Sequence, residues 1–379
     1  MLMTDLSFLS VVEDGPDDYV VGNGETFINV PAIGAEVVRL LDGTRTPAEV
    51  RSRVLREHGV DVDVEDFLTG LGGAGLLRPP EVRPNLWDRV RPGHVRWLFS
   101  RPAHLLVAVL FAGAVAAMAV RPEVSPTYTG LVWTNSLAFT LTFAAASWLL
   151  VFVHELSHIA AARSLGVRAE LSLGTRLQFL VAQTRVTGVW RLPRRARYRV
   201  HLAGMRTDLA IASAGTCYLA FAGPSPADGL VRLAVLICWS QIAWQFLFFM
   251  RTDVYYAYAN LTGEKNLMDD AQAYLRAVLA RRPRPPVARG VRAYARFLVV
   301  GRVLGLAFFA GYMVPITVAA CARAWEEYQA SPGSLTPLAT IAVIAAGWLL
   351  YVYVFVRQRL RSRRTAGAAA PERESADVA

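Results

Sequence analysis

The sequence predicts a mainly α-helical, polytopic membrane bundle of about six spans, preceded by a small N-terminal α+β domain of winged-helix type. Of the 379 residues, 54% are hydrophobic and the mean hydropathy is +0.33, which is high for a soluble protein. Residues 1–80 hold 14 acidic residues against six arginines, a net charge of −8. Because the whole chain carries +10, the remainder carries +18. An acidic soluble head is therefore followed by a basic membrane body.

The head, residues 1–80, contains signals for one hairpin and three helices. Two β-prone runs in the segment 18–30, DYVVGNGETFINV, are separated by Gly22-Asn23-Gly24, a sequence typical of a tight hairpin. Three segments with helical spacing of apolar residues follow, at 32–43, 46–59 and 63–77. The second of these begins with Thr46-Pro47 and Glu49, the pattern of a capping box.

The membrane body is predicted to cover residues 103–358, after a linker rich in Pro, Arg and Trp at 81–102. Most of its apolar segments approach the ~20 residues that a span requires. The segments are 103–120, 131–158, 209–222, 229–250, 297–320 and 335–356. The third is short, so a re-entrant or interrupted helix stays open for it. Residues 359–379 are predicted to be a disordered basic tail.

Arginine distribution predicts the orientation of these spans. Ten arginines lie in residues 163–208, eight arginines and one lysine in 251–296, and six arginines in the tail. The intervening loops carry one arginine or none. Positive charges collect on the cytoplasmic side of membrane proteins, so we expect a multi-pass protein of the cell membrane with both termini cytoplasmic.

One apolar segment contains ionisable residues that lipid would disfavour. The sequence WLLVFVHELSHIAAARSLG, residues 148–166, includes His154, Glu155 and His158. Residues at i and i+4 share a helix face, so the two histidines can offer imidazoles to one metal ion. Glu155 is then adjacent, as the general base of a zinc-dependent hydrolase requires. Charged groups at membrane depth are costly and usually functional, which favours a metal site over a chance match.

A catalytic zinc site needs a third protein ligand, and Asp253 is the best candidate. The segments that end near His158 and near Met250 both run toward the cytoplasmic side. Asp253 therefore lies at a depth similar to that of the histidines. Asp208, Asp269 and Asp270 are the weaker rivals.

The membrane segment resembles the site-2-protease-type (M50-like) intramembrane zinc metallopeptidases. The resemblance covers about residues 140–275 and rests on HELSH, on HLAGMRTDLAIA and on the downstream Asp253-Val254-Tyr255. Within that group the chain is similar to the bacterial peptide zinc metalloprotease branch. The resemblance implies that His154 and His158 bind Zn²⁺, that Asp253 is the third ligand and that Glu155 is the base.

The head resembles PqqD-like peptide-recognition domains, through FINVPAIGAEVVRLLDGTRTPAEV and DVEDFLTGLGGAGLL. The resemblance implies that it binds a leader peptide by strand addition. We expect the strand of Thr26, Phe27 and Ile28 to receive the peptide, and Phe67 and Leu68 to supply a pocket. A DNA-binding role for the winged-helix-like domain is disfavoured by its charge of −8. A purely structural cap is the remaining alternative.

Together these features predict a membrane-embedded zinc endopeptidase that acts at the cytoplasmic side, in maturation of a ribosomally made peptide. Its expected partners are a precursor or leader peptide, the lipid bilayer, and a peptide-modifying enzyme or transporter, with no nucleic acid. The alternative is a non-catalytic membrane chaperone or exporter subunit that binds the precursor. A membrane oxygenase with two irons is disfavoured because the six histidines of the chain are too few and too dispersed.

Overall fold

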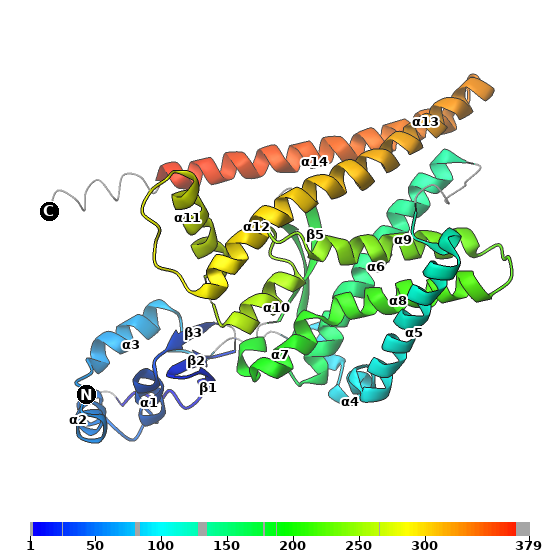
Figure 1. The fold of residues 1–379 in the computed structure, drawn as a ribbon. Coiled ribbons are helices and arrows are strands. Elements are labelled where there is room, and N and C mark those ends of the chain that lie inside the picture. The colour runs from blue at the N-terminus through cyan, green and yellow to red at the C-terminus, as the bar shows by residue number, and fades with distance from the viewer. Residues whose placement is uncertain are drawn as a thin grey trace.

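The protein is mainly helical, with a small head joined to a long helical body (Figure 1). The computed structural model describes residues 3–24, 26–79, 84–127, 135–176, 179–186, 188–264 and 266–368. The head lies at one end of the body, beside α7 (Arg194–His201) and α10 (Asp253–Thr262).

The sheet of the head has three antiparallel strands in the order β1-β2-β3. They are β1 (Ser10–Gly15), β2 (Asp18–Gly22) and β3 (Phe27–Val30). The predicted hairpin is confirmed as β2–β3, with Val21 opposite Ile28. The sequence reasoning missed β1, whose apolar run is short and begins beside Phe8-Leu9.

The three predicted helices of the head are confirmed as α1 (Ala32–Leu40), α2 (Pro47–His58) and α3 (Val64–Gly73). Thr46 and Glu49 form the expected capping box of α2, and Asp63 caps α3. Gly59 ends α2 with φ of 69°, a left-handed conformation that favours glycine.

The two faces of the head sheet have different neighbours. Val21 and Val30 are buried in the hydrophobic core of the head, and Ile28 packs against that core. Successive side chains of a strand alternate between faces, so Val20 and Asn29 lie on the opposite face, which is turned toward α7 and α10. The sheet therefore separates the core of the head from the membrane body.

The predicted linker, 81–102, is an ordered connection over its described residues, 84–102. It forms η1 (Leu86–Arg89), α4 (Pro92–Val95) and η2 (Arg96–Phe99), and then enters α5. Arg163 donates hydrogen bonds to the carbonyls of Asp88 and Val90, at 3.1 and 2.8 Å. These contacts attach the connection to the end of the helix that carries HELSH.

Among the described residues, four helical stretches are long and apolar enough to cross a membrane. They are α5 (Arg101–Val120), α6 (Ser136–Ser164), the run Arg289–Ala330, and residues Leu335–Val354 of α14 (Leu335–Ala368). The run comprises α12 (Arg289–Phe308), the π-helical η5 (Phe309–Met313) and α13 (Val314–Ala330).

The expected count of six spans is not confirmed. The third and fourth predicted segments are the helices α8 (Ala203–Phe221) and α9 (Asp228–Gln245), neither of which belongs to the four. Their lengths of 19 and 18 residues are near the minimum, and α8 carries Arg206 and Asp208 near its start. α8 and α9 pack on each other and on α5 and α6.

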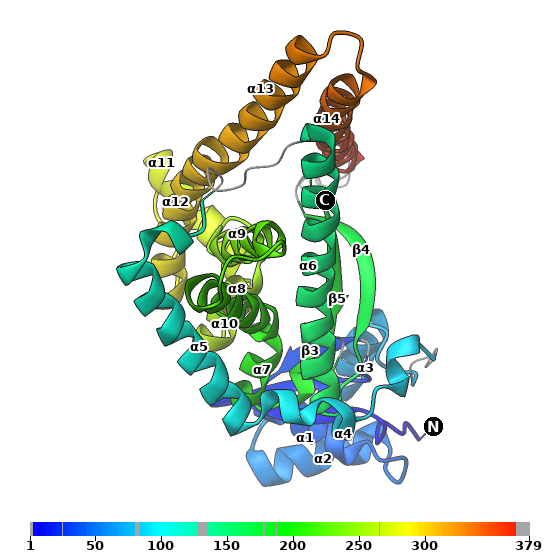
Figure 2. The same ribbon diagram turned by 90° about the vertical axis from the view of Figure 1, so that its right-hand side faces the viewer.

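Further elements of the body lie beside these helices. The hairpin β4 (Glu170–Arg176) and β5 (Phe179–Arg185), which was not predicted, runs beside α6 (Figure 2). α11 (Leu267–Leu279) packs on α12. The helix α14 continues to Ala368, which corrects the predicted tail of 359–379 in its first part; residues 369–379 lie outside the described residues.

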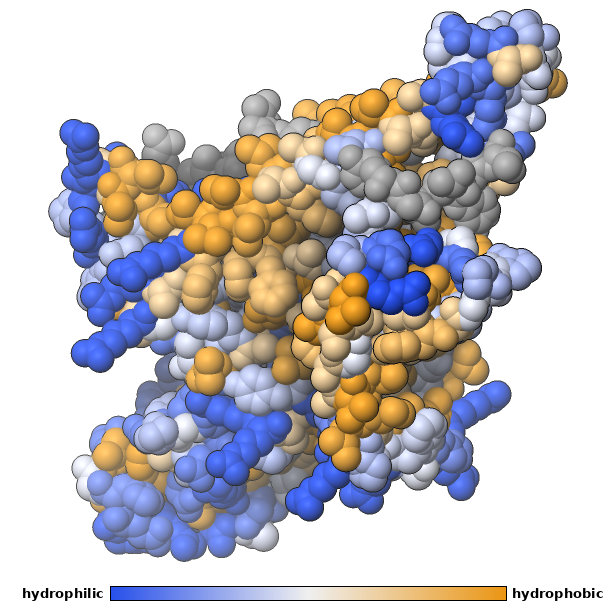
Figure 3. All heavy atoms as spheres, turned by 45° about the vertical axis from the view of Figure 1, so that its right-hand side comes forward, coloured by the Kyte–Doolittle hydropathy of each residue, from blue (hydrophilic) through white to orange (hydrophobic). Residues whose placement is uncertain are grey.

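The surface of the body is strongly apolar. Hydrophobic residues gather over its middle and hydrophilic ones over the head (Figure 3). Exposed large side chains of three candidate spans include Leu105, Leu149 and Leu306. Such exposure is expected where lipid replaces water around the protein.

Candidate metal centre

Two histidines of α6 point to one position. His154 and His158 are both buried, and their Nε2 atoms lie 3.3 Å apart. The separation of four residues places both rings on the same face of the helix, as the sequence predicted. The pair therefore presents two imidazole nitrogens at the end of a candidate membrane span.

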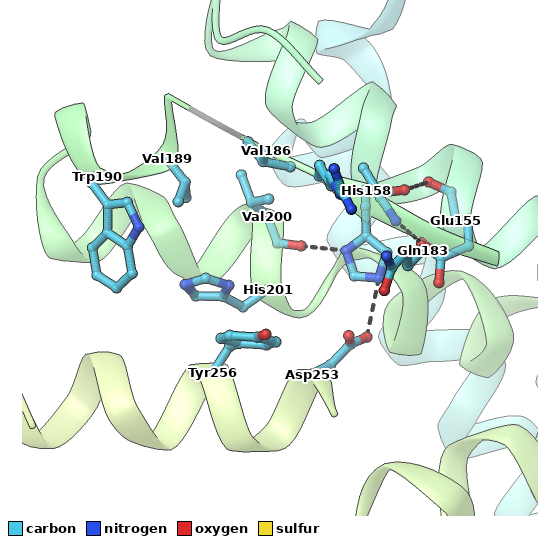
Figure 4. A pocket seen from close by; sticks show the side chains of 12 residues that line it. Glu155, His158, Gln183, Val186, Val189, Trp190, Val200, His201, Asp253 and Tyr256 are labelled. Atoms are coloured by element: carbon cyan, nitrogen blue, oxygen red, sulfur yellow. Dashed lines mark hydrogen bonds and ion pairs between the residues drawn. The ribbon is translucent and has the colours of Figure 1, made fainter. Parts of the chain in front are cut away.

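Asp253 joins this pair from α10. Its Oδ2 atom lies 3.2 Å from the Nε2 of His154 and 3.2 Å from the Nε2 of His158. Asp253 is the first residue of α10, and its backbone N–H donates to the side-chain carbonyl of Gln245 at 3.0 Å. Gln245 is at the end of α9. The turn between α9 and α10 thus holds the carboxylate against α6 (Figure 4).

The opposite nitrogen of each imidazole has an acceptor. His154 Nδ1 lies 2.7 Å from Oδ2 of Asp208, and His158 Nδ1 lies 2.7 Å from the carbonyl oxygen of Val200. Since a carboxylate and a carbonyl accept, each Nδ1 carries a proton, and a ring that is neutral then has its lone pair on Nε2. Acceptors of this kind orient metal-binding histidines in many proteins.

With both rings neutral, three electron-rich atoms meet in this buried place. The Oδ2 of Asp253 has no hydrogen-bond partner in the described part of the chain. Repulsion among a carboxylate oxygen and two nitrogen lone pairs is relieved by a cation. The group His154, His158 and Asp253 is therefore one that could hold a metal ion.

Gly204 of α8 allows His154 to occupy its position. A Cβ atom built on Gly204 would lie 2.3 Å from the Nε2 of His154, and 2.4 to 2.5 Å from two ring carbons. Any side chain at residue 204 would therefore collide with the face of the imidazole. Glycine permits the backbone of α8 to approach the ring closely.

Glu155 lies beside the same group and contacts β5. Its Oε2 atom accepts a hydrogen bond of 2.7 Å from the backbone N–H of Thr184. The Thr184 hydroxyl donates to the backbone carbonyl of Glu155 at 3.0 Å. These two bonds fix the start of the HELSH segment against the hairpin and orient the carboxylate.

A cavity of about 350 Å³ opens on these residues. Glu155, His158 and Asp253 line one end, Trp190 lines the other, and Tyr256 lies between Asp253 and Trp190 (Figure 4). His201 stacks on Tyr256 within it, with ring centroids 5.9 Å apart. Burial lowers the pKa of His201 to about 4, so His201 is neutral near pH 7.

The donor set fits zinc. Two imidazole nitrogens and one carboxylate oxygen, with an accessible cavity beside them, are the three protein ligands and open position of catalytic zinc sites. Of the rival acids, Asp208 contacts His154 on the far side of its ring. Asp269 lies at the surface, 3.6 Å from Arg251, and Asp270 is on the same helix.

Several residues of the site were not predicted as parts of it. Val200 contacts His158, and Thr184 contacts the Glu155 carboxylate, through backbone atoms, which no side-chain pattern reveals. Gln245 is a polar residue within an apolar segment. A polar side chain is costly in lipid, and this was the sequence signal that could have identified Gln245 as part of the site. Asp208 was considered only as a rival ligand, although its contact orients His154.

The predicted peptide-binding residues lie in the head, away from this cavity. Thr26, Phe27 and Ile28 belong to β3 or directly precede it, and β3 is an edge strand of the described sheet. Ile28, Phe67 and Leu68 pack, partly buried, against the core of the head. Phe27 lines a second cavity at the junction between the head and the body.

Comparisons with known proteins concern the head alone. Residues 18–77 match the family model described as coenzyme PQQ synthesis protein D (PqqD). No curated protein and no solved structure matches the chain. The resemblance of residues 140–275 to site-2-protease-type peptidases therefore stays a prediction. Residues 18–77 thus form a PqqD-like domain, joined to a body whose described part has four helices that could span a membrane.

Proposed function

We propose that the chain is a membrane-embedded zinc endopeptidase that cleaves a ribosomally made peptide at the cytoplasmic side of the membrane. The observation that carries this proposal is the convergence of three lone-pair atoms beside Glu155. The Nε2 atoms of His154 and His158 and the Oδ2 of Asp253 lie 3.2 to 3.3 Å from one another, and His158 and Asp253 line a cavity.

The three residues would hold Zn²⁺ through those atoms. Bound zinc polarises a scissile carbonyl and lowers the pKa of a water to about 7. Asp208 and the carbonyl of Val200 keep the Nδ1 proton on each imidazole, so both Nε2 atoms stay free to bind. Burial of the group among α6, α8 and α10 excludes bulk water and strengthens these interactions.

Glu155 is the base in this proposal. Its carboxylate takes a proton from the attacking water and gives it to the leaving nitrogen as the amide C–N bond breaks. The N–H of Thr184 holds one carboxylate oxygen, Oε2, and orients the side chain on the wall of the cavity. A site with a purely structural metal has no need of such a carboxylate, which distinguishes the proposal from a chaperone or exporter subunit.

The PqqD-like head supports a peptide substrate. We infer that a precursor or leader peptide adds to the free edge of β3, where backbone hydrogen bonds supply affinity. The charge of −8 over residues 1–80 favours a peptide with basic residues and makes association sensitive to salt. A peptide-modifying enzyme or a transporter would be a partner in the same maturation.

The test combines metal content with cleavage. The protein, reconstituted in nanodiscs, is incubated with a library of random dodecapeptides, and the products are identified by mass spectrometry. We expect about one zinc per chain and defined cleavage products. Glu155→Gln should retain the metal and lose cleavage by a factor of at least 10², the usual contribution of a general base. Exposed Glu326 supplies the control, Glu326→Gln, which should behave as wild type.

Ligand variants complete this test. His154→Ala, His158→Ala and Asp253→Ala should each lose zinc, whereas Asp269→Ala at the surface should retain it. Wild-type zinc content in the His154→Ala and His158→Ala proteins would remove the site assignment. Cleavage by Glu155→Gln at the wild-type rate would remove the role of Glu155.

A further inference from the structure

A second cavity, of about 250 Å³, lies between the head and the membrane body. Phe27 and Asn29 of β3 contribute from the head, and Ala259 and Asn260 of α10 contribute from the body. This cavity is on the face of the head sheet that is turned away from the core of the head. It has no role in the zinc chemistry proposed above.

This second cavity adjoins the metal cavity. Trp190 and Tyr256 line both of them. In Figure 4 Trp190 lies at the end of the metal cavity that is farther from Glu155, and Tyr256 lies between Trp190 and Asp253. A chain that left the metal cavity past Trp190 and Tyr256 would therefore enter the second cavity and meet β3.

The walls of the second cavity suit a peptide. Trp190, Tyr256 and Phe27 provide aromatic surface. Asn260 is only 5% exposed, and its Oδ1 atom has no hydrogen-bond partner among the described residues. Its Nδ2 atom donates to the carbonyl of Arg194 at 2.9 Å, which fixes the amide. A buried acceptor without a partner is costly, and a backbone N–H of a bound peptide would satisfy it.

A buried ion pair holds the wall in place. Asp14 of β1 accepts from Arg197 of α7 at 2.7 Å, and both side chains are almost completely buried. The Arg197 guanidinium also lies over the Trp190 ring, 5.0 Å from its centroid. The head is thereby fixed to the body on one side of the cavity, and Trp190 is fixed between the two cavities.

At two residues of β3, the backbone N–H and C=O groups point outward from the edge of the described sheet. The N–H of Asn23 donates to the carbonyl of Thr26 at 3.2 Å. Hydrogen-bonded and non-hydrogen-bonded pairs alternate along an antiparallel ladder. Val21–Ile28 is two positions from the pair of Asn23 and Thr26, so it is also a hydrogen-bonded pair, and the backbone of Ile28 bonds to β2. The backbone groups of Phe27 and Asn29 therefore face away from β2, and both residues also line the second cavity.

We propose that the second cavity is a peptide subsite that connects the β3 edge to the metal cavity. It takes the segment of an extended peptide between the part paired with β3 and the part that enters the metal cavity. An apolar or aromatic side chain of that segment fills the aromatic wall, and a backbone N–H donates to Asn260 Oδ1. This inference rests on the proposed function for the identity of the ligand as a peptide.

The experiment measures binding without cleavage. The full chain with Glu155→Gln, loaded with zinc in nanodiscs, is used to select from a random dodecapeptide library displayed on its own mRNA. Enriched peptides are labelled with fluorescein, and their Kd is measured by fluorescence anisotropy. Ala259→Phe fills the cavity from α10 and Asn29→Phe fills it from β3. Leu261→Phe, at an exposed position of the same helix, is the matched control.

We expect enriched peptides to bind at least tenfold more weakly to Ala259→Phe and to Asn29→Phe, and equally to Leu261→Phe. Asn260→Leu, which removes the acceptor at similar volume, should weaken binding about three- to tenfold, the usual effect of one hydrogen bond. Thermal melting and zinc content verify that each variant is folded. Two filling variants from separate elements guard against the failure of either one.

Two results would overturn the subsite. One is a Kd within twofold of the parent in both folded filling variants, and the other is a library that yields no binding peptide. Cleavage of the same peptides by the wild type tests the proposed function separately. Peptides that bind through the second cavity and are not cleaved would refute the peptidase and leave the subsite in place. A cleavage rate that is unchanged in both filling variants would refute the subsite and leave the peptidase in place.

Discussion

The Nδ1 atom of His154 and the Oδ2 atom of Asp208 are 2.7 Å apart, in a buried contact between α6 and α8. The proton of this hydrogen bond stays on Nδ1, which leaves Nε2 of His154 free to face Asp253 and His158. The contact therefore determines the direction in which His154 offers its lone pair.

Asp208→Ala should lower zinc affinity by about 10- to 100-fold, the usual effect of removing an acceptor from a metal-binding histidine. Asp208→Asn keeps an acceptor oxygen and should lose less. Competition with a chromogenic zinc chelator measures both. Asp228→Ala, at the start of α9, is the control. Equal affinity in Asp208→Ala and in the control would show that the contact does not orient the ligand.

Gly204→Ala should displace the His154 ring. The added Cβ would lie 2.3 Å from Nε2, so either the ring or α8 must move, at a cost of about 1 to 3 kcal/mol. We expect zinc binding to fall more than tenfold and the melting temperature to fall. Gly347→Ala in α14 is the control, because no atom lies within 4 Å of its added Cβ. A Gly204→Ala protein with normal zinc affinity would contradict this packing.

Asp14→Ala should loosen the head from the body. It leaves the buried guanidinium of Arg197 without its carboxylate, which typically costs about 3 to 5 kcal/mol. The expected result is faster release of the head by limited proteolysis and a lower melting temperature. The double variant Asp14→Ala, Arg197→Met should recover part of the loss, because no unpaired charge is buried. Additive losses in the double variant would mean that the two residues are not coupled.

Cysteine labelling distinguishes six crossings from four. In a variant without Cys217, Cys238 and Cys321, single cysteines are placed at Ser125, Ser225 and Arg284. Six spans with cytoplasmic termini predict that residues 125 and 225 react with an impermeant maleimide from outside, and that residue 284 does not. Protection of residue 225 together with labelling of residue 125 would show that α8 and α9 do not cross.

The sequence alone predicted much of the local architecture of the head and the helical position of the two histidines. Capping residues, turn glycines and apolar periodicity predicted the hairpin and three helices of the head, since these signals act within a few residues. The i, i+4 spacing of His154 and His158 predicted that they share a helix face, because helix geometry fixes that relationship. The net negative charge of residues 1–80 and the net positive charge of the remainder likewise predicted a soluble head and a membrane body.

Only the tertiary structure decided which distant groups meet. The packing of α8 and α10 on α6 brings Asp208, Gly204 and Asp253 to the histidines. The structure also fixes the bounds of α8 and α9, whose composition within those bounds leaves them outside the four long apolar helices although both pack on α6. The backbone bonds of Thr184 and Val200 and the cavity shared through Trp190 and Tyr256 depend on close packing between segments far apart in sequence. No local pattern encodes such contacts, because their free energy arises only when the surfaces meet.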